Sequence, residues 1–158
     1  MIDNNYIRLN RIIALLIFIV TFIVYFDTMA PTVSYWDCGE FIAVSHTLGV
    51  PHPPGSPFFL LMGRIFSMLP FNEDIAFRVN VISPLVSALA VMLLYLSTVK
   101  VITHWRGRVN NITDVMIVFG GAAVGALTFA FTDSHWFNAV EAEVYAFSTF
   151  FTAIVVWL

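Results

Sequence analysis

S-Y-W-D-C-G-E-F-I-A-V-S-H-T-L-G-V-P-H-P-P-G-S-P-F-F-L-L-M-G-R, residues Ser34 to Arg64, is the polar, turn-rich stretch of an otherwise strongly apolar chain. It brings Asp37, Glu40 and His52 together with four prolines. Long apolar runs lie on both sides of it. The pattern predicts that this stretch belongs to the first external loop of a protein that crosses a membrane several times.

The composition supports a bilayer as the solvent for the rest of the chain. Of 158 residues, 59% are hydrophobic and only 11% are charged, whereas soluble domains carry about 25% charged residues. The net charge is -3, and no basic patch with interleaved aromatic residues is present, which argues against nucleic-acid binding. The single cysteine, Cys38, excludes an internal disulfide and a zinc site built from several cysteines.

Apolar runs on either side of the loop predict an all-α, multi-spanning membrane protein with about four transmembrane helices. The predicted spans cover residues 12–30, 84–103, 115–132 and 144–158, with an external loop over residues 31–83. A run of about 20 residues crosses a hydrocarbon core of about 30 Å. Residues 57–69 are too few to cross, and their polar residues recur at helical spacing, which predicts a short helix in the membrane interface. The segment 133–143 is expected to be a short polar turn.

Two local patterns within these runs carry further expectations. The third run contains G-G-A-A-V-G-A, whose small residues favour close packing between helices. The first run follows Arg8 and Arg11 and ends near the small residue Ala30, which is also typical of a cleaved signal peptide. We favour a retained helix, because the run is long for a signal peptide and Pro31 would directly follow the cleavage site.

The charges predict the orientation of the chain. With a cytoplasmic N-terminus in the cell (inner) membrane, most cations lie inside, as the positive-inside rule requires. The cations inside are Arg8, Arg11, Lys100, Arg106 and Arg108, and those outside are Arg64 and Arg78. The same assignment places eight acidic residues outside: Asp27, Asp37, Glu40, Glu73, Asp74, Asp133, Glu141 and Glu143. Acidic residues contribute little to orientation, so their gathering on one side points to function.

Asp37 and Glu40 are the candidate catalytic residues, and two interpretations are open. The spacing D-x-x-E before an apolar run is that of a helix-capping box, with Asp37 as the N-cap. The positive end of such a helix also favours ionised carboxylates, and an ionised carboxylate is what a general base requires.

Three basic residues are candidates for binding an anionic group. His52 lies in the stiff turn P-H-P-P-G, where it is either a surface histidine or a fixed donor to a phosphate or a sugar hydroxyl. Arg64 and Arg78 either anchor the chain at the membrane interface or hold a phosphate, which the guanidinium fork suits.

His135, Glu141 and Glu143 lie in the second external segment and are expected to line a cavity or to solvate a turn. No complete set of metal-ligand spacings is present, so no metal ligand is assigned. The pattern demands no cofactor, although it leaves a divalent cation open.

At this point the loop resembles that of protein O-mannosyltransferases, which carry a pattern like D-E-x-H-F, then a glycine, then V-H-P-P and an interfacial helix. Asp37 and Phe41 have the spacing of the first part, Gly49 follows, and Val50 to Pro54 resemble the second part. Arg78 matches in kind an arginine early in the second span of that family. The chain departs from the pattern at Cys38, which stands where the family has its second acid.

The segments W-D-C-G-E-F, L-G-V-P-H-P-P-G, F-R-V-N and V-E-A-E-V-Y are similar to a bacterial membrane family catalogued as domain of unknown function 2723 (DUF2723), which is related to those transferases. The resemblance implies the N-terminal part of a GT-C glycosyltransferase. Such enzymes move a sugar, here mannose or another, from a polyprenyl-phosphate donor to a protein or glycan acceptor at the outer face. Residues 1–158 alone are expected to be inactive, because this class also uses later parts of the chain.

Two other functions stay open at this stage. A non-catalytic membrane scaffold or binding subunit would use the loop as a docking surface. A transporter would place ionisable residues deep within its spans, and the four apolar runs contain almost none, which counts against it.

Overall fold

The computed structural model describes residues 4–107 and 109–158, so Arg108 lies outside the described residues. Every regular element of the described residues is helical. The elements are α1 (Asn4–Thr28), α2 (Cys38–Thr47), α3 (Pro57–Met68), α4 (Ile75–Asn80), α5 (Ile82–Arg106), α6 (Ile112–Val115), the π-helical segment η1 (Met116–Gly120), α7 (Gly121–Ala130), α8 (Asp133–Ala139) and α9 (Tyr145–Trp157).

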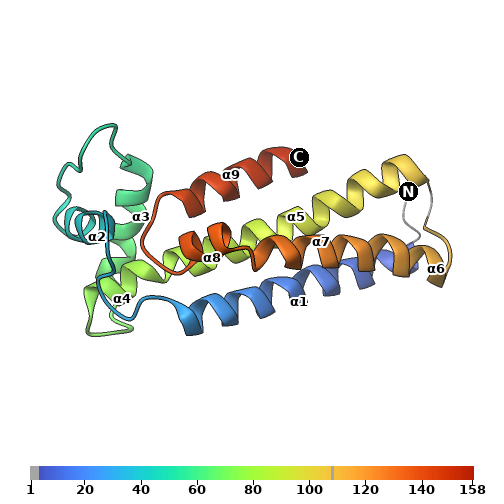
Figure 1. The fold of residues 1–158 in the computed structure, drawn as a ribbon, viewed down its shortest axis with the longest axis horizontal. Coiled ribbons are helices and arrows are strands. Elements are labelled where there is room, and N and C mark those ends of the chain that lie inside the picture. Colours follow the sequence, from blue (N-terminus) through green and yellow to red (C-terminus); the bar gives the residue numbers. More distant parts are fainter. Residues whose placement is uncertain (1–3, 108) are drawn as a thin grey trace.

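The long helices lie side by side as an elongated bundle, and α2, α3 and α4 gather at one end of it (Figure 1). Helix α5 is central, because α1, α7, α8 and α9 all pack against it. Three helical stretches are long and apolar enough to cross a membrane, and they cover Tyr6–Thr28, Ile75–Arg106 and Ile112–Ala130. These three stretches confirm an all-helical membrane protein. Helix α9 is apolar but has 13 residues, so the fourth span remains a prediction.

Two segments differ from their sequence predictions. Residues 75–80, predicted to lie in the external loop 31–83, form α4 and run almost without interruption into α5. Asp74 is the N-cap of α4, and its carboxylate accepts from the Ala76 amide at 2.7 Å. The segment 133–143, expected to be a turn, begins with helix α8. His135 and Ala139 are the buried residues of α8, and their spacing of four places both on one helical face, so the short helix has an inner face to pack.

The predicted packing of the small-residue run is made by its alanines, since Ala122 and Ala126 are buried in the core where α7 packs against α5, whereas its glycines make no close approach. A Cβ atom added at Gly120, Gly121 or Gly125 would meet open space. The close approach occurs instead at Gly63 of α3, where a Cβ atom would lie 2.8 Å from the Cβ of Ser45 in α2. Gly63 therefore sets the separation of the two loop helices.

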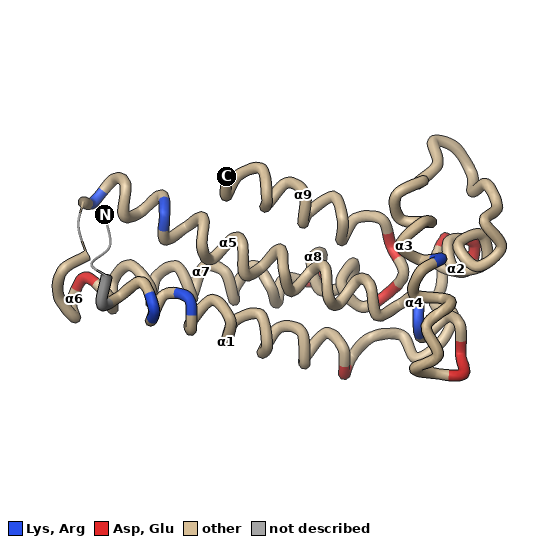
Figure 2. Tube along the Cα trace, turned by 180° about the vertical axis from the view of Figure 1, so that it is seen from behind, with Lys and Arg blue, Asp and Glu red and all other residues tan. Residues whose placement is uncertain are grey.

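Figure 2 shows that acidic residues gather mainly at one end of the bundle, whereas basic residues lie at both ends, because Arg64 and Arg78 belong to α3 and α4. Arg8 and Arg11 lie early in α1, and Lys100 and Arg106 lie late in the neighbouring α5, so these cations share one end. Acidic residues gather at the other end, near α2 and α4. Asp114 is the acidic exception, and it pairs with Arg106 at 3.5 Å.

The segment that follows α1 is tied to two other parts of the chain. The Ala30 amide donates to the Val140 carbonyl at 2.8 Å, which connects it to the segment between α8 and α9. The fully buried Asn80 side chain donates to the carbonyls of Ala30 at 2.8 Å and Thr32 at 2.9 Å. These bonds satisfy backbone groups of the segment that follows α1 and hold the first loop beside the α8–α9 segment.

We expect Asn80→Ala to lower the free energy of unfolding by about 2 kcal/mol, because it removes both hydrogen bonds that the buried Asn80 side chain donates to the carbonyls of Ala30 and Thr32. The measurement is chemical or thermal unfolding of the full-length protein in a mild detergent. Asn110→Ala is the control, since Asn110 is exposed. Equal stability of the two variants would contradict the role given to Asn80.

We expect Gly63→Ala to destabilise the protein by about 1–3 kcal/mol, because the added methyl group overpacks the contact with Ser45. The same unfolding measurement tests it. Adding Ser45→Gly should recover part of the loss by vacating the space that the methyl group needs. A double variant no more stable than Gly63→Ala alone would show that this contact is not the cause.

Candidate functional site

The backbone before α2 places the Asp37 carboxylate in the open. Trp36 adopts a left-handed backbone conformation with φ of 62°, which is uncommon for a residue other than glycine. Asp37 follows as the N-cap of α2, but its side chain makes no capping hydrogen bond and is 60% exposed. The capping-box interpretation is therefore wrong for the described structure, and the Asp37 carboxylate is available to a ligand.

Glu40 is engaged with His52 across the loop. The Oε2 atom of Glu40 accepts from Nδ1 of His52 at 2.6 Å, and Oε1 accepts from the His52 amide at 2.8 Å. The hydrogen bond from His52 lowers the pKa of Glu40, and the same contact raises the pKa of His52. The other ring nitrogen, Nε2, lies 4.0 Å from Oδ2 of Asp37. Glu40 thus holds the imidazole with its free nitrogen toward Asp37.

A cavity of about 430 Å³ opens beside this cluster, within the size range of small-molecule sites. Its walls come from the first loop and from the segment that leads into α9. Its lining residues are Trp36, Asp37, Phe41, His52, Pro54, Gly55, Ser56, Glu143, Val144 and Tyr145. The lining combines carboxylates, an imidazole and aromatic rings, a set able to hydrogen-bond a polyhydroxylated ligand and cover its apolar face.

Behind the cavity wall lie three groups that sequence reasoning did not connect. Cys38, Glu141 and Glu143 are all buried, and the Cys38 thiol donates to Oε1 of Glu143 at 3.7 Å. Burial raises the pKa of the Glu143 carboxyl and raises that of the Cys38 thiol to about 12.

The remaining candidates lie outside the lining of the cavity. Arg64 donates to the carbonyl of His46 near the end of α2, and Arg78 donates to the carbonyl of Leu69 at 3.0 Å, just after α3. His135 is buried between Tyr25 and Phe129, and burial lowers its pKa to about 4. The described structure thus brings Asp37, Glu40, His52 and Glu143 together, whereas Arg64, Arg78 and His135 have other partners.

Sequence reasoning missed the aromatic walls and the Glu40–His52 pair. Trp36 and Tyr145 are more than half exposed, yet they line one cavity although more than a hundred residues separate them. The one indication in the sequence that these two segments come together was that both are acidic and both were assigned to the external side.

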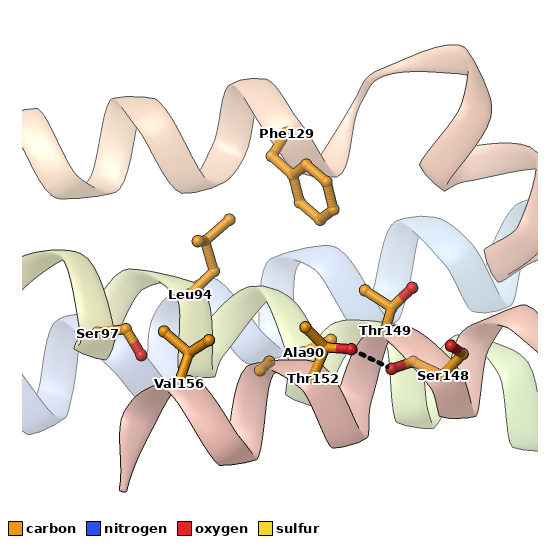
Figure 3. A pocket seen from close by; sticks show the side chains of 9 residues that line it. Ala90, Leu94, Ser97, Phe129, Ser148, Thr149, Thr152 and Val156 are labelled. Atoms are coloured by element: carbon orange, nitrogen blue, oxygen red, sulfur yellow. Dashed lines mark hydrogen bonds between the residues drawn. The ribbon is translucent and has the colours of Figure 1, made fainter.

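A second cavity of about 350 Å³ lies between α5, α7 and α9, and Figure 3 shows its lining. Leu94, Phe129 and Val156 supply apolar surface. The hydroxyl of Thr152 donates to the Ser148 carbonyl of its own helix at 2.8 Å (Figure 3), so it is satisfied without a ligand. This cavity suits hydrocarbon and offers no ionisable group.

These features define a helical membrane protein with an acid-lined cavity at one end of its bundle. Residues 37–158 match the model of the protein O-mannosyl-transferase TMEM260 N-terminal domain. The chain therefore belongs to the TMEM260 family of protein O-mannosyl-transferases.

Relatives agree with this assignment. The chain is 32% identical to the protein O-mannosyl-transferase tmem260 of Dictyostelium discoideum over 90% of its own length, and 29% identical to the Mus musculus protein of that name over 77%. It spans only 16% and 15% of these two relatives. No solved structure matches it.

We expect Glu40→Gln to lower the pKa of His52 toward the ordinary value of 6.5, because the charge-assisted hydrogen bond is weakened. Protonated His52 contributes its full stabilisation of the loop at pH values below 6.5. This contribution is lost as the pH rises through the raised pKa of His52. Glu40 has a lowered pKa, so its contribution is lost as pH falls through that value.

The measurement is a histidine NMR titration of the full-length protein. Glu73→Gln is the control, because Glu73 is exposed and does not line the cavity. An unchanged His52 titration in Glu40→Gln would contradict the pairing.

Proposed function

We propose that the full-length protein is a GT-C membrane glycosyltransferase that transfers a sugar from a polyprenyl-phosphate donor to an acceptor hydroxyl at the external face. Family membership supports the reaction class, and the names of the relatives favour mannose and a protein acceptor. The motif resemblance supports a place in the DUF2723 branch. Residues 1–158 supply the N-terminal part of the module, so later parts of the chain complete the site.

One observation carries the proposal: an uncapped, 60% exposed carboxylate, Asp37, in the wall of a cavity of about 430 Å³. A carboxylate without a capping partner is free to accept a proton from a ligand. The aromatic and polar lining suits a sugar ring.

In the proposed reaction Asp37 takes the proton of the acceptor hydroxyl while that oxygen forms a bond to the anomeric carbon of the sugar. The bond between the anomeric carbon and the phosphate oxygen breaks, and the polyprenyl phosphate leaves with the electron pair. His52, held by Glu40, donates a hydrogen bond to the departing phosphate. Glu40 positions His52 rather than reacting, whereas Arg64 and Arg78 would reach the phosphate only by leaving their present partners.

The membrane assignment extends the same proposal. The chain contributes four spans to a multi-pass protein of the cell membrane, with a cytoplasmic N-terminus and the cavity outside. Arg8, Arg11, Lys100 and Arg106 lie at the end of the bundle opposite the cavity and outnumber Arg64 and Arg78 on the cavity side, which supports this orientation. The donor's tail then lies in lipid while its phosphosugar meets the cavity at the interface.

We expect Asp37→Asn and Asp37→Ala to lower sugar transfer by the full-length protein at least about 100-fold, because a general base contributes this much or more. The assay incubates radiolabelled polyprenyl-phosphate mannose with membranes carrying each variant and a protein acceptor. Glu73→Gln should retain wild-type transfer. Full activity in both Asp37 variants would exclude Asp37 as the base. Loss of sugar transfer in Glu73→Gln would show that the negative charge of the loop as a whole, rather than Asp37, is what the reaction requires.

A further inference from the structure

Three buried groups to which the proposed reaction assigns no role meet at the edge of the cavity, where Glu143 contributes to its lining. Cys38, Glu141 and Glu143 are 0%, 6% and 8% exposed. One ligand atom from each, a thiol sulfur and two carboxylate oxygens, lies within 4.8 Å of the other two. Cys38 is the first residue of α2, whereas the two glutamates precede α9. The cluster therefore links the start of α2 to the segment before α9. The bond from the Ala30 amide to Val140 links the residues that follow α1 to the same segment.

This cluster lacks a counter-charge among the described residues. The ion pairs found there involve Asp37, Glu40 and Asp114 but neither Glu141 nor Glu143. Oε1 of Glu141 is buried without a hydrogen-bond partner, and so is the hydroxyl of nearby Ser34. Buried carboxylates are costly unless a cation, a metal or a proton compensates them.

We propose that Cys38, Glu141 and Glu143 bind a zinc ion that fastens the start of α2 to the segment before α9. The ligand set favours this metal, because a thiolate with carboxylates suits a borderline-soft divalent ion better than magnesium or calcium. In tetrahedral zinc sites neighbouring ligand atoms lie roughly 3.3–3.8 Å apart. The three ligand atoms, which lie within 4.8 Å of one another, thus need to approach by about 1.5 Å at most.

The orphaned groups fit this assignment. Zinc would bind the Glu141 oxygen that has no partner, and the Ser34 hydroxyl or a water molecule would complete four ligands. The thiol proton leaves when the metal binds, since the thiolate is the ligand. The alternative occupant is a proton shared between the two glutamates, which the following experiment distinguishes.

The test measures metal content of the full-length protein, purified without chelator and dialysed against micromolar zinc. We expect one zinc per chain in the wild type by elemental analysis. Cys38→Ser and Glu141→Gln should each weaken zinc binding at least about tenfold, whereas Glu73→Gln should bind like the wild type. Cobalt substitution gives a second readout, because a thiolate–cobalt bond produces a near-ultraviolet charge-transfer band that Cys38→Ser must abolish.

Gel filtration of each variant establishes that it is folded, and Glu141→Gln, which preserves volume, serves if Cys38→Ser does not fold. Wild-type protein without bound zinc would overturn the proposal in favour of the shared proton. Zinc retained equally by both variants would overturn it as well. Wild-type protein that takes up no zinc but still transfers sugar would refute the metal site while leaving the transferase function standing.

Discussion

The backbone groups of Ala30 are the junction on which the functional end of the bundle depends. Its amide reaches the segment before α9, and its carbonyl is held by the Asn80 side chain where α4 meets α5. Near a membrane such groups have little water to bond, so protein partners become obligatory. The two bonds therefore fix the exit of α1 against both neighbouring segments, and the first loop begins from a defined position.

The composition of the site follows from that junction. With residues 30–32 held, α2 starts beside the segment that carries Glu141 and Glu143, and Asp37 shares a cavity with Glu143 and Tyr145. The apolar bundle contributes rigidity rather than chemistry. Ionisable groups are confined to its ends, so the cavity combines a firm scaffold with a polar lining.

The fold class was readable from the sequence because long apolar runs are a strong signal, and three of the four predicted runs have spanning length in the structure. The sequence analysis placed Asp37 and His52 in one loop, and in the structure Nε2 of His52 lies 4.0 Å from Oδ2 of Asp37. Two features were not readable. The hydrogen bond between Glu40 and His52 joins residues that are 12 positions apart in the sequence. The contact between Cys38 and Glu143 joins residues that are 105 positions apart. Local spacing instead suggested a capping box at Asp37, whose side chain makes no capping hydrogen bond in the structure.

The central claim is that the sugar to be transferred sits in the cavity walled by Asp37, His52 and Tyr145. The most direct measurement is an experimental structure of the full-length protein with a polyprenyl-phosphate sugar bound. The account predicts the sugar in this cavity, with an Asp37 oxygen about 3 Å from the position that an acceptor hydroxyl occupies beside the anomeric carbon. A sugar bound elsewhere, or an Asp37 carboxylate shielded from it by protein, would contradict the account.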